Sequence, residues 1–390
     1  MALRRWFWVK VVVCLGMAAG MVLSPRLWMS SRSYPLTPVA DFLTPVPRPW
    51  DAIWFAAILA LLAAIVLLPH SRVPVIAFVI AAGLLPLWDQ SRLQPWFYQY
   101  LFMLMAFGVA ATPTRDGSND KQDRLLNPCR LIIIGIYFYS GLQKCNHEFL
   151  CDGGTASWLL QPTFKAVPES WTDLIWRARY AIPVMEMLIG IGLFFRFTRW
   201  LAVPAAIVMH AFILWTLGPT GHNWNTVVWP WNGAMMLLVP LLFLGARNAT
   251  AGAIAWGGRR AFQKLILLLF GFLPLLSFFR WWDAYLSASL YSGNIPQVWM
   301  EFDKEVFDAL PPNVQQECFG SGERYEVNLT SWSIAELNVP DYPANRVEQH
   351  IAEALARRFP QSEIVLTIRG KPDIWTGERV KTKQIFNLQE

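Results

Sequence analysis

Long apolar runs separated by short polar segments dominate the chain between residues 6 and 279. Hydrophobic residues make up 55% of the 390 residues and charged residues only 15%, an apolar share above that of soluble domains. A helix of about 20 apolar residues crosses a bilayer. The sequence therefore predicts an all-α polytopic membrane helix bundle of about nine transmembrane helices. The expected spans are Trp6–Leu23, Ile53–Leu68, Val73–Leu87, Trp96–Ala111, Leu131–Leu142, Ala181–Phe195, Trp200–Leu217, Val227–Leu244 and Phe262–Phe279.

The run Leu131–Leu142 is too short to span a bilayer by itself. It reaches that length only if the helix extends back through Cys129 and Arg130 or forward through Gln143 and Lys144. We therefore expect a longer helix here, with polar residues facing the interior of the bundle.

Basic residues indicate the orientation. Arg4 and Arg5 precede the first run, which no small-x-small cleavage site follows directly, so we expect a retained helix. Ala246–Arg260 carries three Arg and no acid. Cytoplasmic loops are rich in Lys and Arg, which predicts an inner-membrane protein with a cytoplasmic N-terminus and a periplasmic or lumenal C-terminus. The Lys and Arg are scattered between apolar runs, so the net charge of +6 does not indicate nucleic-acid binding.

The chain divides into an N-terminal helix and outer loop (1–50), a transmembrane bundle (51–280) and a C-terminal region (281–390). In the last region, Tyr325–Leu337 and Ile364–Ile368 have the composition of strands, and Asn345–Phe359 repeats apolar residues at helical spacing. These patterns predict a small C-terminal α+β extramembrane domain.

Two ionisable residues lie in the middle of expected spans. Glu186 is in Ala181–Phe195 and His210 is in the next span. A charge at bilayer depth costs about 2.5–3.5 kcal/mol, so such residues face the bundle interior and find a partner. If the two helices are antiparallel neighbours, both residues lie at similar depth, and we expect a direct contact between them. They are candidate catalytic residues, and the alternative is a polar pair that only holds the helices in register.

A second cluster lies at the end of the fifth expected span. Tyr137, Gly141 and Lys144 follow i, i+4, i+7 spacing and so share one helix face, with Gly141 allowing close approach of another helix. Lys144 is either a desolvated amine that acts as a catalytic base or an interfacial lysine whose amine reaches the membrane surface.

A third cluster lies in the outer loop before the eighth expected span. Its polar members indicate the mouth of a substrate or cofactor pocket, with Asn225 and Asn232 seven residues apart on one helix face and Pro230 interrupting a hydrogen bond of that helix. The tryptophans Trp224, Trp229 and Trp231 have an alternative use as an interfacial belt. The polar members are His222, Asn223, Asn225 and Asn232.

Cys145 and Cys151 fall in the outer connection Gln143–Tyr180, where an oxidising compartment permits a disulfide. Two free thiols are the alternative. The sequence has no Cys-x-x-Cys or His-Glu-x-x-His spacing, and so it gives no metal signature.

The order of these parts resembles the vitamin K-dependent γ-carboxylase and HTTM membrane family over about residues 50–280. The resemblance lies in Tyr137-x-x-x-Gly141-x-x-Lys144, a following Asn-His-Glu-Phe turn, a helix with Glu186 before a Gly-x-Gly, and a helix with a central His210. It implies that Lys144 is the base that deprotonates a hydroquinone cofactor, and that Lys144 faces the lumenal side.

Two functions follow from these observations. In one, a quinone or lipid-like ligand enters from the lipid bilayer, Lys144 acts as base, and the remaining polar residues orient the reactants. In the other, the polar residues only stabilise the bundle, and the C-terminal domain anchors or assembles an envelope protein partner.

Overall fold

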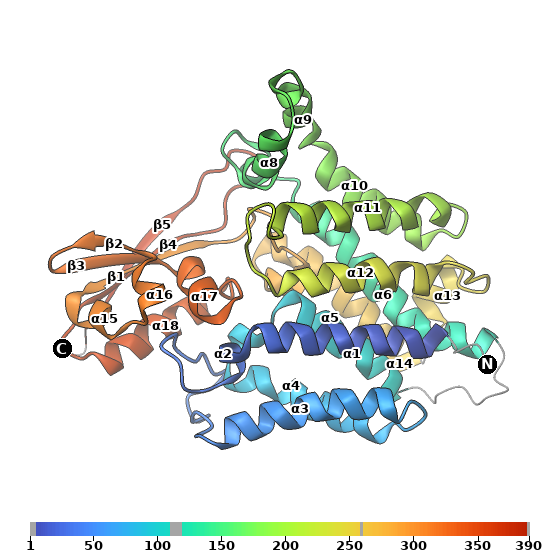
Figure 1. Cartoon of the computed structure of the whole chain (residues 1–390), viewed down its shortest axis with the longest axis horizontal. Coiled ribbons are helices and arrows are strands. Elements are labelled where there is room, and N and C mark those ends of the chain that lie inside the picture. Colours follow the sequence, from blue (N-terminus) through green and yellow to red (C-terminus); the bar gives the residue numbers. More distant parts are fainter. Residues whose placement is uncertain (1–4, 110–118, 258–259, 388–390) are drawn as a thin grey trace.

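The computed structural model describes residues 5–109, 119–257 and 260–387. Three residues used above lie outside this range: Arg4 and Arg259, which bear on orientation, and Ala111, the expected end of a span. The described chain forms a bundle of long helices with a small mixed domain at one end (Figure 1). We call this the domain end of the bundle.

Among the described residues, the bundle contains nine long helical segments, in the order that the sequence predicts. They are α1 (Arg5–Leu23), α3 (Trp50–Leu67), α4 (Val73–Trp88), α5 (Pro95–Val109), α6 (Asn119–Gln143), α10 (Ala181–Phe194), α11 (Arg199–Leu217), α12 (Val228–Phe243) and α14 (Arg260–Leu267), which continues as a π-helical turn (Leu268–Phe272) and a 3-10 helix (Leu273–Phe279).

Five segments of the described chain are long and apolar enough to cross a membrane. They are Arg5–Leu23, Trp50–Leu67, Asp123–Gln143, Arg199–Leu217 and Ala261–Phe279. The helices α4, α10 and α12 are apolar but shorter. The helical membrane-type fold is thus confirmed, and the count of nine spans stays a prediction.

Helix α6 extends well before Leu131, and the polar residues Asp123, Asn127 and Arg130 in this part of it are buried. The Arg130 guanidinium donates to the carbonyl of Leu242 on α12 (2.7 Å), to the Asp123 carboxylate (2.7 Å) and to the Asn127 side chain (2.7 Å). A buried charge of this kind is tolerated when its donors are all used. The backward extension through Cys129 and Arg130 is therefore correct.

Short helices form the connections between the long ones. In the connection between α6 and α10, Figure 1 shows α8 and α9 beside the bundle, next to the domain end of α10. The short elements are α2 (Pro25–Trp28), η1 (Gln90–Arg92), α7 (His147–Leu150), α8 (Thr155–Ala166), η2 (Glu169–Trp171), α9 (Thr172–Ala178), α13 (Ala251–Trp256) and η5 (Tyr285–Ser287).

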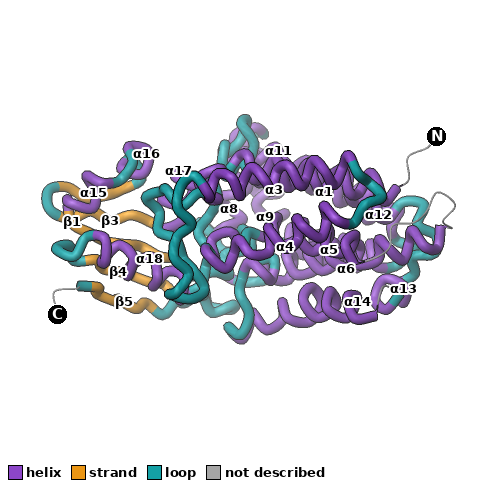
Figure 2. The backbone as a smooth tube through the Cα atoms, turned by 90° about the horizontal axis from the view of Figure 1, so that it is seen from below, coloured by secondary structure: helices purple, strands orange, loops and turns teal. Residues whose placement is uncertain are grey.

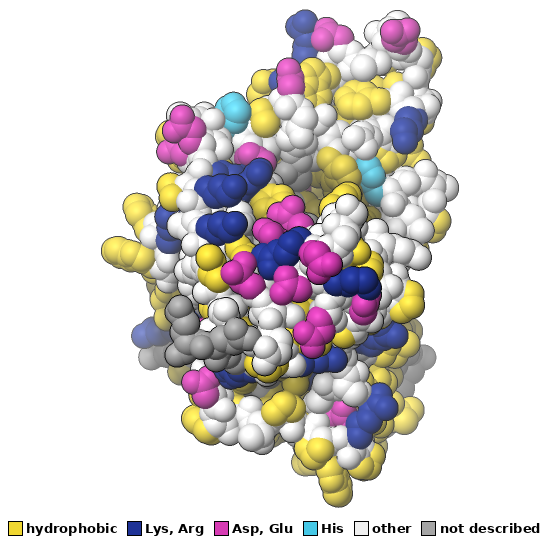
Figure 3. Space-filling view, turned by 90° about the vertical axis from the view of Figure 1, so that its left-hand side faces the viewer, with side chains coloured by type: hydrophobic (Ala, Val, Ile, Leu, Met, Phe, Trp, Pro, Cys, Tyr) yellow, Lys and Arg dark blue, Asp and Glu magenta, His cyan; other side chains and the backbone are white. Residues whose placement is uncertain are grey.

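The C-terminal domain is a five-stranded antiparallel sheet of order β2-β3-β1-β4-β5 with four helices. Figure 2 shows the strands gathered at one end of the molecule, and Figure 3 shows Lys and Arg intermixed with Asp and Glu on that end. The elements are β1 (Gln297–Asp303), α15 (Lys304–Ala309), α16 (Pro312–Gln315), β2 (Cys318–Ser321), β3 (Arg324–Asn328), α17 (Leu329–Leu337), α18 (Asn345–Arg358), β4 (Ile364–Arg369) and β5 (Lys381–Phe386).

The expected strand Tyr325–Leu337 is wrong beyond Asn328. The Asn328 side chain accepts hydrogen bonds from the backbone N–H groups of Thr330 and Ser331, which is an N-terminal cap, and the helix α17 follows. The expected helix from Asn345 and the expected strand from Ile364 are confirmed as α18 and β4.

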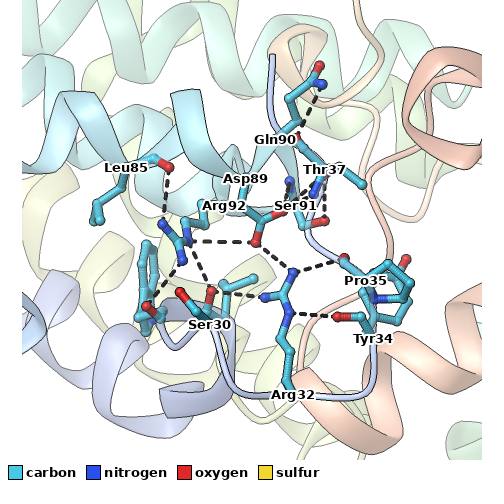
Figure 4. A network of polar contacts seen from close by, with 12 residues as sticks. Ser30, Arg32, Tyr34, Pro35, Thr37, Leu85, Asp89, Gln90, Ser91 and Arg92 are labelled. Carbon is cyan, nitrogen blue, oxygen red and sulfur yellow. Dashed lines mark hydrogen bonds and ion pairs between the residues drawn. The ribbon is translucent and has the colours of Figure 1, made fainter. Parts of the chain in front are cut away.

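The loop between α2 and α3 ties the domain to the bundle. The Glu336 carboxylate on α17 accepts from the backbone N–H groups of Ser33 (2.6 Å) and Tyr34 (2.9 Å). One residue earlier, Arg32 pairs with Asp89 at 2.7 Å, and both side chains are buried (Figure 4). The loop is thus held by hydrogen bonds to the Glu336 carboxylate and, next to them, by the Arg32–Asp89 ion pair.

Helices α6 and α10 approach at backbone contact. A Cβ atom built on Gly141 would lie 2.5 Å from the carbonyl oxygen of Pro183, and one on Gly190 would lie 2.9 Å from the backbone nitrogen of Phe138. Small residues are the usual means of such close packing between membrane helices. Gly141 therefore has the role that the sequence predicts.

Gly141→Ala should separate the two helices. Because the new methyl group meets backbone atoms that cannot rotate away, we expect a loss of about 1–3 kcal/mol in stability, seen as a lower melting temperature in detergent. The matched control is Gly233→Ala on α12, where a Cβ meets nothing within 4 Å and the gain in helix propensity is at most about 1 kcal/mol. Equal shifts for the two variants would contradict this packing.

Glu348 on α18 is a buried carboxyl group whose charge is not compensated. The residue is fully buried, and neither carboxyl oxygen has a hydrogen-bond partner among the described residues. Burial, followed by the nearby Asp341 carboxylate, raises the pKa of Glu348 well above its usual 4.5. In the folded domain Glu348 therefore binds a proton that the unfolded chain releases.

This difference makes the domain less stable as the pH rises. Above pH 4.5 the unfolded chain ionises while the folded domain holds the proton, so stability falls by about 1.4 kcal/mol per pH unit up to the folded-state pKa. Glu348→Gln should remove this slope and raise the melting temperature at pH 8. The partly exposed Glu353, on the same helix and paired with Arg357, provides the control variant Glu353→Gln. A wild-type slope that persists in Glu348→Gln would refute the assignment.

Candidate functional site

A cavity of about 590 Å³ lies among α5, α6, α10, α11 and α12 and the chain that follows α14. Its walls are mainly apolar, which is usual for sites that take small ligands. Its main polar side chains come from four helices and lie toward the domain end of the bundle. These are Tyr137, Ser140, Lys144, Glu186, His210 and Asn232.

Lys144 and Glu186 form a buried ion pair in this cavity. The Lys144 Nζ lies 2.8 Å from Glu186 Oε2 and 2.7 Å from Ser140 Oγ. Both residues are buried, so the amine is directed into the bundle rather than toward its surface. The close approach of α6 and α10 at Gly141 brings the two side chains together.

His210 belongs to a separate chain of hydrogen bonds. Its Nε2 lies 2.6 Å from the Tyr137 hydroxyl and its Nδ1 lies 2.7 Å from the Asn232 side-chain oxygen. The Asn232 amide nitrogen donates to the carbonyl of Val228, which fixes the amide so that its oxygen faces His210. The Asn232 oxygen therefore makes Nδ1 the donor, and in the neutral imidazole Nε2 is then the atom that accepts the Tyr137 proton.

The expected direct contact between Glu186 and His210 is wrong. The two residues line the same cavity, but Glu186 pairs with Lys144, and His210 bonds to Tyr137 and Asn232. The sequence alone did not exclude Lys144 as a partner, because both it and Glu186 lie near the domain end of their helices. The depth of Glu186 along its helix could not by itself decide whether Lys144 or His210 is its partner, because that choice depends on how the helices are rotated.

The polar cluster at the start of α12 contributes one residue, Asn232, to the cavity directly, and a second residue, Asn225, through its contact with Tyr291. Asn232 lines the cavity, and Asn225 donates to the hydroxyl of Tyr291, which also lines it. His222 instead stacks on Trp158, with ring centroids 4.1 Å apart, and Asn223 is exposed. Neither of these two contacts the cavity.

The spacing predicted that Asn225 and Asn232 share a helix face, and this prediction is wrong. Asn225 has a φ of 48° in the turn before α12, a conformation that asparagine tolerates better than most residues. Helix α12 begins at Val228, so Pro230 falls in its first turn, where no intrahelical bond is lost. Trp231 lines the cavity and donates to Gln99 rather than belonging to a surface belt.

Several cavity residues carry no sequence signal that we recognised. Tyr285 and Tyr291 line the cavity from the connection between the bundle and β1, a segment without periodicity. Ser140 is one turn before Lys144 and contacts its amine. The i, i+4 spacing of these two residues is the one signal that could have found it.

Cys145 and Cys151 are free thiols in the structure. Each sulfur is directed to a carbonyl of its own segment, that of Gly141 for Cys145 and that of Glu148 for Cys151. The alternative of two free thiols, and not the disulfide, describes the structure. Within the described residues, no group of three or more His, Cys, Asp or Glu side chains could hold a metal ion.

The cavity opens sideways between α10 and α11. Met185 and Val208 both line it, yet they are 46% and 68% exposed on the outside of the bundle. Val208 is the central residue of α11, one of the helices long enough to cross a membrane. The opening is therefore at mid-height of that helix.

The arrangement thus consists of a buried ion pair and a histidine hydrogen-bonded at both ring nitrogens, in an apolar cavity with a lateral opening. Comparison of the chain with protein-family models, with curated proteins and with solved structures finds no match.

Proposed function

We propose that this protein is a membrane enzyme that binds a lipid-soluble ligand in the cavity and transfers a proton to or from it through Lys144 and Glu186. The observation that carries the proposal is the buried ion pair in a cavity that opens at the middle of a membrane-length helix. In this proposal nine helices span an inner membrane, the N-terminus is cytoplasmic, and the charged domain end lies outside.

The position of the opening argues for a ligand that dissolves in the bilayer. At the height of Val208 the surroundings of a spanning helix are hydrocarbon, from which a water-soluble compound is excluded. The cavity walls are mainly apolar, with a few polar groups at one end. A quinone or hydroquinone, with an apolar tail and oxygens on its ring, matches this pattern. The resemblance to the γ-carboxylase and HTTM family supports the same ligand class and the same role for Lys144.

The ion pair supplies both a proton donor and a proton acceptor. In the resting pair Lys144 is an ammonium and Glu186 a carboxylate. Transfer of one proton between them leaves an amine, which takes the proton of a ligand hydroxyl and becomes an ammonium again. The pair then holds one extra proton, on Glu186, beside the ligand oxyanion, and the resting pair is restored when Glu186 releases that proton to the product or to water. Groups placed in this way contribute about 10²–10⁴-fold to a reaction rate.

Tyr137 and His210 offer a second route for a proton. With His210 neutral and donating from Nδ1 to Asn232, the Tyr137 hydroxyl donates to Nε2. The lone pairs of the phenol oxygen are then free to accept from a ligand hydroxyl. As the ligand proton moves to this oxygen, the Tyr137 proton moves to His210, whose orientation Asn232 fixes. A dihydroxy ligand could thus lose one proton at each station.

The second candidate is a non-catalytic membrane protein whose C-terminal domain holds an envelope partner. The mixed-charge face of the domain end favours it (Figure 3), because such faces meet water or other proteins rather than lipid. Native mass spectrometry of the purified protein separates the two functions. A co-purified quinone supports the enzyme, and a stoichiometric protein partner without a small molecule supports the anchor.

The chemistry of the ion pair can be separated from its structural role with three variants. Lys144→Met and Glu186→Gln each leave one member of a buried pair without its counter-charge, at a cost of about 3–5 kcal/mol. The double variant removes both charges, so we expect it to regain most of the lost melting temperature. It should nevertheless remain inactive in a complementation assay in the native host.

Lys264→Met is the matched control, because Lys264 is exposed near the opposite end of the bundle. This substitution should change neither the melting temperature nor the activity in the complementation assay. An active double variant would remove the pair from the chemistry and leave it as a structural contact. His210→Leu should lower the melting temperature because it leaves the Tyr137 hydroxyl and the Asn232 side chain without their hydrogen-bond partner. It leaves the ion pair of Glu186 with Lys144 in place.

The orientation is tested by reporter fusions. A fusion after Arg260 should be active on the cytoplasmic side and one after Glu390 on the outer side, because one spanning segment, Ala261–Phe279, separates them. Activity of both fusions on the same side would remove that segment from the membrane and contradict the nine-span arrangement.

A further inference from the structure

The connection between α8 and α10 exposes an apolar stripe. Trp171 and Leu174 are 56% and 59% exposed, and Ala178 follows at the spacing that places all three on one helix face. Asp173 and Arg177 pair with each other at 3.0 Å, and their side chains are highly exposed. Helix α9 therefore has an apolar side and a charged side.

The stripe continues across the turn at Arg179 and Tyr180 onto α10. Ala181, Met185 and Leu188 repeat the same three- and four-residue spacing and are exposed, and Ala178, Ala181 and Met185 line the cavity. The apolar side of α9 is thus continuous with the outer surface of a proposed spanning helix and with the lateral opening.

Arg179 ties the end of α9 to the short helix α7. Its guanidinium donates to the carbonyls of Leu150 (2.7 Å) and Trp176 (2.8 Å) and to the Tyr180 hydroxyl (2.8 Å). It also packs 3.7 Å from the centre of the Trp176 ring. The position of α9 is therefore built into the fold. Trp, Tyr and Arg are also the residues that gather at the boundary between lipid and water.

We propose that α9 lies in the headgroup region of the outer leaflet and forms the outer rim of the lateral opening. Trp171 and Leu174 insert among the lipids, and Arg177 faces the phosphate groups. The partner of this surface is a phospholipid bilayer. The outer connection is then in part a membrane-bound element, and it borders on its headgroup side an opening that reaches from Ala178 and Ala181 to the height of Val208. This inference rests on the proposed membrane placement of the cavity.

The experiment measures the depth of spin labels in nanodiscs of phosphatidylcholine and phosphatidylglycerol. In a chain in which Cys145, Cys151 and Cys318 are replaced by Ser, one label is attached at Leu174→Cys and another at its neighbour Asp173→Cys on the charged side. Oxygen concentrates in lipid and a nickel chelate in water. We expect the ratio of oxygen to nickel collisions to be at least about threefold higher at position 174, as burial of one face of an amphipathic helix requires.

A third label, at Val208→Cys, distinguishes failure of this inference from failure of the proposed function. A lipid-like ratio at 208 with equal, water-like ratios at 173 and 174 overturns the placement of α9 alone. A water-like ratio at 208 overturns the membrane placement of the cavity and this inference with it. Protection of the label at 174 from both reagents would indicate a protein cover and would also overturn the proposal.

Discussion

The contact between the backbones of α6 and α10 is the constraint on which the site depends. The ion pair between Lys144 and Glu186, 2.8 Å long, requires the two helices to keep a fixed distance and a fixed rotation about their axes. Gly141 and Gly190 provide this because no side chain separates the helices there. Each charge would be unfavourable alone at this depth, and together they neutralise each other. The two glycines therefore determine the geometry of the ion pair, although they have no side chain that could react.

The same rule explains the other buried charges of the bundle. Arg130 places its donors on α6 itself and on α12, and Arg32 and Asp89 satisfy each other beside the loop that carries the domain. These groups have fixed partners and lie away from the cavity. Lys144 and Glu186 differ because they line a space of about 590 Å³ in which a ligand can compete for their hydrogen bonds. Accessibility to a ligand, more than charge, separates a site from a structural contact.

The sequence allowed the order and type of most helices to be predicted, because hydrophobic runs of membrane length leave few alternatives. It also singled out Tyr137, Lys144, Glu186, His210 and Asn232, in three separate clusters, because polar groups within apolar runs are rare. The structure shows that these five residues line one cavity. It could not predict which of them touch. Pairing depends on helix rotation, which is set by contacts such as that of Gly141 with Pro183 and has no signature in one sequence. The strand expected at Tyr325–Leu337 failed because the Asn328 cap outweighed the local composition.

The Glu336 clamp on the loop after α2 has a consequence for how the chain is made. The hydrogen bond from Ser33 to Glu336 joins residues 303 positions apart, so the first outer loop waits for its partner until almost the whole protein has been synthesised. Under the proposed orientation, that partner must also be carried through the membrane. Early helices can insert one by one, but the junction closes only after the last span has formed and translocation of the tail is complete. Synthesis that stops before α17 would leave a bundle in which the backbone N–H groups of Ser33 and Tyr34 lack their carboxylate acceptor. Quality-control proteases can recognise such an incomplete form.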